Sequence, residues 1–150
     1  MRIHMGTDHA GFEYKEEMKK RLIAEGYDVV DHGALEYDPR DDYPEPCIAC
    51  ALAVAEEEAE GSLGIVIGGS GNGEQIAANK VRGIRAILAW NNETAVLGRE
   101  HNNANVISVG ARQHSIDEAY SLVKAFIETT FTQDERHVRR IGKIQDYEKK

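Results

Sequence analysis

Segments typical of strands and segments typical of helices alternate along this chain, and the alternation restricts the fold more than any other feature. Apolar, β-branched runs typical of buried strands are separated by amphipathic or alanine-rich stretches typical of helices. We expect strands at 3–7, 27–30, 63–67, 84–89 and 106–109. We expect helices at 12–25, 44–60, 91–99, 115–130 and 133–147, and the start of another at 74–80. This order predicts an α/β fold with a five-stranded parallel sheet covered by helices on both faces.

The length and charge of the chain exclude several classes of protein. Its 150 residues fit one ordinary domain, which we expect to span 1–150. The net charge of −8 argues against nucleic-acid binding, which needs a basic face. The longest apolar run, 47–55, is too short to span a bilayer, and the N-terminus lacks the layout of a signal peptide. We therefore expect a cytoplasmic protein that binds neither nucleic acid nor membrane.

Cys47 and Cys50 form a C-x-x-C pair, an arrangement also found in redox dithiols and in halves of zinc sites. The chain has no further cysteine to complete a zinc site, and the pair follows no evident strand. Small apolar residues three positions apart suit the buried face of an alanine-rich helix. We therefore favour a packing role for both residues over a redox or metal role.

A basic cluster near the C-terminus contrasts with the acidic remainder of the chain. Arg136 and Arg140 are four positions apart, so both can point at one anion from a single helix, although surface arginines that bridge to acids are also common. Arg139 is out of phase with them and fits a structural role. The helix expected at 133–147 is mostly charged and lacks a complete apolar face, so we expect it to pack on a second subunit of a homodimer.

A glycine-rich loop, G-G-S-G-N-G at 68–73, connects the central expected strand to a helix. Glycines let successive N–H groups converge at a helix N-terminus and cradle negative charge, although a tight turn without a ligand is the alternative. The loop lacks the Lys-Ser/Thr ending of a P-loop and the G-x-G-x-x-G spacing of a dinucleotide fingerprint. Glu74 beside it would repel a pyrophosphate. An anion formed during a reaction, such as an enediolate, therefore fits better.

Glu74 is the residue on which a reaction at this loop depends. A carboxylate in the first turn of a helix also compensates the helix dipole, and that ordinary role needs no ligand. One residue after the cradle, however, the carboxylate can reach a carbon whose oxygen lies among the amides. From there it can remove the proton of that carbon and return it to the neighbouring one. The helix N-terminus lowers the pKa of Glu74 and burial raises it, and the sequence leaves the balance open.

Several segments, in order and over almost the whole chain, resemble the ribose-5-phosphate isomerase B and galactose-6-phosphate isomerase family. These segments are 7–11, 68–73, 76–80, 101–102 and 110–112. The Asp-His-Ala-Gly start combined with the glycine loop and Ala-Ala-Asn-Lys is specific, whereas each alone is weak. The resemblance implies a Rossmann-like three-layer αβα sandwich and a homodimer with shared active sites, possibly paired into a tetramer. It also implies reversible isomerisation of D-ribose 5-phosphate to D-ribulose 5-phosphate through a cis-enediolate, with no metal or organic cofactor.

The resemblance assigns roles residue by residue. His101 would open the sugar ring with help from Asp8, and Glu74 would move the proton between C2 and C1. Ser70 and Asn102 would bind the hydroxyls and the enediolate, although both also suit capping or turn positions, and His101 could equally hold a polar loop. The remaining residues would bind the negative oxygen and the phosphate: Gly69, Gly71, Asn72 and Gly73 for the oxygen, and His9, Arg112, Arg136 and Arg140 for the phosphate. In the family picture, the arginines of the last helix reach into the neighbouring subunit's site.

One position departs from the family pattern. Many members carry at position 68 a cysteine whose thiolate is the base, but Gly68 cannot act in this way. The chain instead resembles the members with a glutamate at the position of Glu74. Two alternatives to the pentose reaction remain, namely isomerisation of a six-carbon sugar phosphate such as allose or galactose 6-phosphate, and a non-catalytic sugar-phosphate sensor. A sensor would need neither Glu74 nor His101, so their presence argues against it.

Overall fold

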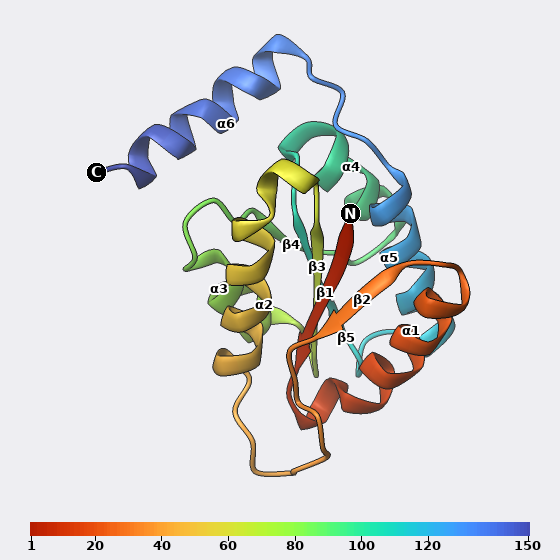
Figure 1. Cartoon of the computed structure of the whole chain (residues 1–150). Coiled ribbons are helices and arrows are strands. Elements are labelled where there is room, and N and C mark those ends of the chain that lie inside the picture. Colours follow the sequence, from red (N-terminus) through yellow and green to blue (C-terminus); the bar gives the residue numbers. More distant parts are fainter.

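The computed structural model describes residues 1–150 and contains one five-stranded sheet in which every strand pair is parallel. The strands are β1 (Arg2–Thr7), β2 (Asp28–Asp31), β3 (Leu63–Gly68), β4 (Ala86–Leu88) and β5 (Val106–Gly110). Their order, β2-β1-β3-β5-β4, places β3 in the centre (Figure 1). The register aligns Ile65 with Met5 on one side and with Ile107 on the other. The predicted five-stranded parallel sheet is confirmed.

Helices cover both faces of this sheet, as expected for a three-layer αβα sandwich (Figure 1). The helices are α1 (Phe12–Ala24), α2 (Pro44–Glu56), α3 (Asn72–Asn79), α4 (Asn92–Asn102), α5 (Ile116–Glu128) and α6 (Glu135–Glu148), with short 3₁₀ turns at His9–Gly11 and Glu58–Glu60. α1, α4 and α5 contribute to the core on one face, and α2 and α3 to the core on the other. No helix combines the length and the apolar composition needed to cross a membrane.

The central strand β3 explains why its segment reads as one continuous apolar run. All six of its residues are buried. Ile65 and Ile67 face the larger core cluster beneath α1 and α5, whereas Val66 faces the smaller cluster beneath α2 and α3. A strand covered on both faces has no solvent side, and therefore no polar alternation.

Cys47 and Cys50 of α2 lie in the smaller core cluster and are fully buried. Burial raises the pKa of both thiols, that of Cys50 to about 12, so neither is a thiolate at neutral pH. This burial supports the packing role over the redox role.

Two helix ends differ from the sequence-based expectation. α2 ends at Glu56, and a 3₁₀ turn replaces the last part of the helix expected to 60. α4 continues past the expected end at 99, and it ends where Asn103 takes a left-handed conformation with φ of 45°. His101 and Asn102 therefore lie in the last turn of a helix, and the expectation that His101 lies in a polar loop was wrong.

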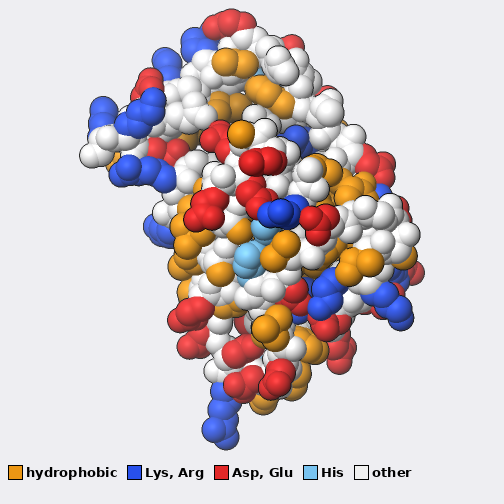
Figure 2. Space-filling model, in the orientation of Figure 1, with side chains coloured by type: hydrophobic (Ala, Val, Ile, Leu, Met, Phe, Trp, Pro, Cys, Tyr) orange, Lys and Arg blue, Asp and Glu red, His pale blue; other side chains and the backbone are white.

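α6 extends from the body of the molecule beyond the amino ends of the strands (Figure 1). Lys and Arg side chains gather along it in the upper left of Figure 2. Val138 and Ile144 are 49% and 53% exposed, while Ile141 between them is buried. The helix thus has an apolar stripe at three-residue spacing, more of an apolar face than its charged sequence indicated, and its own chain covers only part of it.

Candidate active site

Three neighbouring strands end side by side at the carboxyl edge of the sheet, by which we mean the end where the C-terminal ends of its parallel strands lie. β1 leads to Asp8 and His9, β3 leads to the glycine loop at 68–73, and β5 leads to Arg112. The Arg112 N–H donates to the Gly69 carbonyl at 2.9 Å and joins the last two of these segments. Parallel sheets bind ligands at this edge. The structure therefore brings together these predicted site residues.

The Glu74 carboxylate lies against the end of β3, in the space that a side chain at position 68 would fill. A Cβ placed on Gly68 would overlap this carboxylate. Glu74 is only 5% exposed although it carries an ionisable group. Glycine at position 68 thus leaves the space that the Glu74 carboxylate occupies, and a side chain at this position would compete for it.

Burial raises the pKa of Glu74, and the charge of nearby Asp8 acts in the same direction. Asp8 is itself buried, and its Oδ1 accepts a hydrogen bond from the Ala10 N–H at 3.0 Å. The N–H groups of Glu74 and Gly71 oppose the rise because they stabilise the charged carboxylate at the helix N-terminus. The rise prevails, which settles the balance that the sequence left open. A carboxylate with a raised pKa is better matched to general base catalysis near neutral pH.

The glycine loop turns sharply at Gly71, whose φ of +87° is rarely adopted by a residue with a side chain. Gly71 is the N-cap of α3, and the Ser108 hydroxyl donates to its carbonyl at 2.7 Å. Ser70 is exposed, and its Oγ accepts from the Asn72 N–H at 3.2 Å. Residues 69–73 thus form a tight turn into a helix N-terminus, as expected of an anion cradle, with Ser70 on its exposed side.

Tyr43, which directly precedes α2, lies over the glycine loop although its sequence position did not single it out. A Cβ placed on Gly73 would come within 2.5 Å of the tyrosine ring. Gly73 therefore permits the close approach of the aromatic side chain. A tyrosine in an irregular loop gives no periodic signal, and only the prolines that begin the next helix indicate that the loop ends there.

Asp41, in the same loop, holds His9 and was also not singled out. The His9 N–H donates to Asp41 Oδ1 at 2.8 Å, and His9 Nδ1 lies 2.8 Å from the same oxygen. This hydrogen bond raises the pKa of His9, and the charge of Asp8 adds to the rise. A cavity of about 320 Å³ is lined by His9, Tyr14 and Arg112, among others. Two of the residues predicted to bind phosphate thus share one cavity.

Asp8, His9 and Asp41 form the one group of acidic and histidine side chains whose ligand atoms all lie within 4.8 Å of one another. Such a group has the composition of a cation site. Two of its three members are already joined by hydrogen bonds. These bonds explain the proximity without a cation.

The other predicted site residues lie at the opposite edge of the sheet. His101 and Asn102 end α4, which runs from the carboxyl edge back to the start of β5, and Arg136 and Arg140 lie on α6 beyond that edge (Figure 1). At about 3.3 Å per residue, the length of β3 separates the two edges by roughly 15–20 Å. Within one chain, the structure does not bring these four residues to Glu74.

His101 is stacked on His137 of α6, with ring centroids 4.3 Å apart and ring planes at 20°. His137 is buried, and its Nε2 has no hydrogen-bond partner. Burial lowers the pKa of His137, and the charges of His101, Arg136 and Arg140 act in the same direction. The stack joins the end of α4 to α6, so His101 lies at the same end of the molecule as the two arginines.

The arginines of α6 differ in what they contact. Arg139 pairs with Glu135 at 2.6 Å, which agrees with its predicted structural role. Arg136 and Arg140 are exposed, and neither forms an ion pair within the chain. Both are therefore free to contact an anion outside their own chain.

Comparison with known proteins agrees with the sequence resemblance. The Ribose/Galactose Isomerase family model matches residues 3–144. The chain is 51% identical over 149 residues to ribose-5-phosphate isomerase B of Mycobacterium tuberculosis strain H37Rv, covering 99% of this chain and 91% of the relative. It is 38% identical over 149 residues to the Escherichia coli K12 protein of the same name, covering 99% and 97%.

Solved structures of such proteins have the same fold. Ribose-5-phosphate isomerase B of Clostridium thermocellum superimposes with a TM-score of 0.93 at 40% identity, over 99% of this chain and 98% of the other. The Mycoplasma genitalium protein of that name, with bound ribulose-5-phosphate, gives 0.94 at 38% identity over 99% and 97%. The predicted family is confirmed, whereas the glutamate-base subgroup stays a prediction. The chain belongs to the ribose/galactose isomerase family.

Proposed function

We propose that this chain interconverts D-ribose 5-phosphate and D-ribulose 5-phosphate, the reaction for which its relatives are named. One relative of the same fold was solved with ribulose-5-phosphate bound. The observation that carries the proposal is the buried Glu74 carboxylate with a raised pKa beside the glycine loop. A base placed next to an anion cradle is what proton transfer between two carbons beside a carbonyl requires.

In the proposed mechanism, Glu74 removes the proton from C2 and returns it to C1. The intermediate is a cis-enediolate, whose negative oxygen is held by the N–H groups of residues 69–73 and by the Ser70 hydroxyl. Tyr43 covers one side of the loop, where it restricts the access of water to the intermediate. The base and the cradle belong to the same chain, so this half of the site does the carbon chemistry.

We further propose that two chains share each active site, because the two halves lie at opposite edges of one chain. A two-fold symmetric dimer places the carboxyl edge of each subunit against the α4–α6 edge of the other, and forms two sites. The exposed residues of the α6 stripe, Val138 and Ile144, supply apolar surface for such an interface. This arrangement gives the last helix its expected role in dimerisation.

Ring opening falls to the half-site contributed by the other chain. His101 of the partner subunit moves a proton to or from the ring oxygen, with Asp8 assisting. An imidazole suits this task because its pKa lies near neutrality. Asn102 of the partner subunit binds a sugar hydroxyl from the adjacent position on the same helical turn.

The phosphate group lies between cationic side chains of both subunits. His9 and Arg112 line the cavity on one subunit, and the partner's Arg136 and Arg140 approach from α6. Charge-assisted hydrogen bonds from arginine to phosphate oxygens are among the strongest polar contacts in proteins. The absence of ion pairs at Arg136 and Arg140 supports this role, since neither arginine has to break an ion pair with a carboxylate before it binds the phosphate.

Shared sites predict that two inactive variants complement each other. Glu74→Gln and the double variant Arg136→Met/Arg140→Met each damage every site of their own homodimer. In a mixed dimer, one of the two sites receives both intact halves, so an equal mixture of co-expressed chains is expected to recover about a quarter of wild-type activity. Mixed dimers isolated through two different tags have one intact site of two, so on their own they should show about half of wild-type activity.

The matched control for complementation combines two variants of the same half-site, Glu74→Gln with Gly68→Ala, whose methyl group displaces the Glu74 carboxylate. In their mixed dimer each site retains one damaged carboxyl-edge half, so no activity is recovered. Recovery in this control as well, or none in the first pair, would contradict the sharing of sites.

Asp41→Asn is expected to weaken substrate binding through His9. The raised pKa of His9 keeps the imidazole protonated to higher pH, and without the carboxylate the charge is lost at lower pH. We expect KM to rise by up to roughly tenfold, the size of one charge-assisted hydrogen bond, at a pH just above the ordinary histidine pKa of about 6.5, with a smaller effect below it and little change in kcat. NMR titration of the His9 ring and KM measured against pH test this result.

The control for this variant is Asp42→Asn, which removes the neighbouring exposed carboxylate. It should leave both the His9 titration and KM unchanged. A His9 pKa that is equal in wild type and Asp41→Asn would show that the contact does not hold the proton.

The reaction itself is tested by NMR with ribose 5-phosphate in D₂O. We expect conversion to ribulose 5-phosphate with deuterium at C1, equally fast with a chelator present. Allose 6-phosphate and galactose 6-phosphate, measured in parallel, rank the five-carbon against the six-carbon substrates by kcat/KM. If none of these sugars is converted while ribose 5-phosphate still binds, the sensor alternative replaces the enzyme.

A further inference from the structure

The last turn of α4 carries His101 and Asn102, and the last turn of a helix is stabilised by fewer hydrogen bonds than its interior. The final carbonyl groups of a helix have no partner within the helix, and such ends fray unless other groups bind them. Here Asn103 ends the helix in a left-handed conformation. A side chain that must meet a sugar on another subunit therefore depends on what holds this turn.

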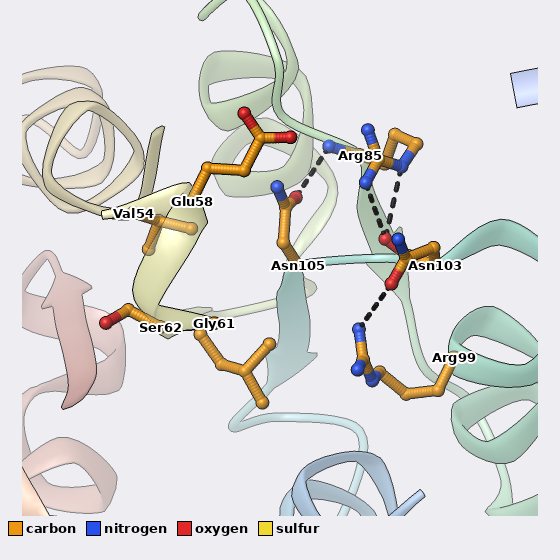
Figure 3. A pocket seen from close by; sticks show the side chains of 9 residues that line it. Val54, Glu58, Gly61, Ser62, Arg85, Arg99, Asn103 and Asn105 are labelled. Carbon is orange, nitrogen blue, oxygen red and sulfur yellow. Dashed lines mark hydrogen bonds between the residues drawn. The ribbon is translucent and has the colours of Figure 1, made fainter. Parts of the chain in front are cut away.

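Arg85, which directly precedes β4, holds the turn from outside the helix. Its Nε donates to the Asn102 carbonyl at 2.9 Å. Its Nε and Nη2 also donate to the Asn103 carbonyl, at 3.1 and 2.8 Å (Figure 3). The Arg85 N–H itself donates to Asn105 Oδ1 at 2.8 Å. The Arg85 backbone is thus fixed by Asn105, and its guanidinium contacts the carbonyl groups at the negative C-terminal end of the α4 dipole.

Arg99 holds the same turn from within α4. Its Nη1 donates to Asn103 Oδ1 at 3.3 Å and to the Ala104 carbonyl, while its Nε donates to the Thr129 carbonyl at 3.1 Å. Figure 3 shows both guanidinium groups directed at Asn103 on the wall of a cavity of about 90 Å³. The two arginines therefore meet at the residue that follows the predicted catalytic turn.

Neither arginine forms an ion pair within 4 Å, although the charges of Glu58 and Glu148 act on Arg85 from farther away. Burial lowers the pKa of both, because each gives up hydration for contacts with carbonyl groups. Lysine cannot replace Arg85 here, because a single ammonium group lacks the planar fork that reaches two carbonyls. The desolvated Arg85 charge holds the backbone carbonyls of Asn102 and Asn103, which directly follow His101.

We propose that Arg85 is a positioning residue for the isomerisation, which fixes the last turn of α4 so that His101 of each subunit reaches the ring oxygen in its partner's site. This inference rests on the proposed function. Arg85 touches neither the sugar nor the phosphate. It holds the half-site that opens the ring, whereas the proton transfer by Glu74 takes place on the other half-site.

The two steps are separable by experiment. Ribulose 5-phosphate has no furanose form because its 5-hydroxyl is phosphorylated, so Glu74 can exchange its C1 hydrogen with solvent without ring chemistry. Conversion that starts from ribose 5-phosphate requires the ring step as well, because this sugar enters the site as a closed furanose. A defect in positioning His101 therefore lowers net conversion while deuterium exchange into ribulose 5-phosphate continues.

The test compares Arg85→Lys and Arg85→Met with the control Arg82→Met, an exposed arginine three residues earlier. A misplaced catalytic group costs up to about 10²-fold, so we expect net conversion to fall by about 10–100-fold in both Arg85 variants. Deuterium exchange should change by less than about threefold, as expected when only one step is damaged. Arg82→Met should match wild type in both measurements.

A general structural role for Arg85 would give a different result. Equal loss of exchange and conversion, loss of the dimer in analytical ultracentrifugation, failure of the milder Arg85→Lys to fold, or unchanged conversion would each overturn the proposal. His101→Asn serves as the reference. If His101→Asn lowers deuterium exchange as much as net conversion, the ring-opening role of His101 is wrong. Wild-type protein that is inactive in both measurements would contradict the proposed function itself.

Discussion

Glu74→Gln is expected to lower kcat for ribose 5-phosphate by at least about 10²–10⁴-fold, the usual contribution of general acid–base catalysis. The amide has the shape of the carboxylate but cannot take the C2 proton. Glu74 faces the glycine loop from a buried position, so water cannot readily replace it as the base. The measurement is a coupled assay together with deuterium exchange at C2, and both should be lost.

The fold of Glu74→Gln should be intact or more stable. The raised pKa of Glu74 means that the folded chain binds a proton here more tightly than the unfolded chain. The charged form therefore opposes folding at neutral pH, and this penalty disappears below the pKa of the unfolded state. A melting temperature equal to or above that of wild type is expected, so inactivity cannot be ascribed to unfolding.

The control for Glu74 is Glu93→Gln. Glu93 also lies in the first turn of a helix but is exposed, so it compensates the helix dipole without a catalytic setting. It should retain turnover. Near-wild-type turnover of Glu74→Gln would remove the base assignment and leave Glu74 with the same dipole role.

The raised pKa of Glu74 also predicts the pH profile of the wild-type reaction. The base acts only when it is deprotonated, so kcat/KM should fall as the pH decreases through a pKa above that of an ordinary glutamate. Asp8→Asn removes the charge that contributes to the rise, and should move this acid limb to lower pH. The direction of that movement separates the effect of Asp8 from that of burial.

Gly68→Ala is expected to abolish most of the activity, although it changes no functional group. The new methyl group would occupy the space of the Glu74 carboxylate and displace it from the end of β3. A displacement of about 1 Å can cost about 10²-fold in rate, and the fall in kcat should be at least of this order. Steady-state kinetics with a melting curve measure the effect, since the methyl group also strains a tightly packed strand end.

A pair of double variants tests whether a thiol can act where the carboxylate now lies. Gly68→Cys/Glu74→Ala places a cysteine at the position where the sequence resemblance implies that many family members carry their base. Gly68→Ala/Glu74→Ala places only a methyl group there and is the matched control. The first variant should be more active than the second. Equal activities would show that a thiol at position 68 cannot act as the base in place of the Glu74 carboxylate.

The sheet, and the gathering of several candidate residues at the carboxyl ends of its strands, could be predicted from sequence alone. The alternation of strands and helices is a local pattern, and a parallel sheet places the residues after β1, β3 and β5 at one edge. The position of Glu74 after the glycine loop follows from chain order in the same way. The strand boundaries shifted by a few residues, as in β4, because edge strands end where tertiary hydrogen bonds end.

Other features were decided only by the tertiary structure. Asp41 and Tyr43 reach the site from an irregular loop, where no periodicity indicates which way a side chain points. The mutual exclusion of a side chain at position 68 and the Glu74 carboxylate depends on space between residues six apart in sequence. The sequence could not show that His101 lies at the opposite end of the strands from Glu74, because spacing along a chain gives the order of the elements and not the distance between them. Whether two chains associate through these surfaces depends on the surface of the folded chain, and this surface forms only when the helices and strands have packed together.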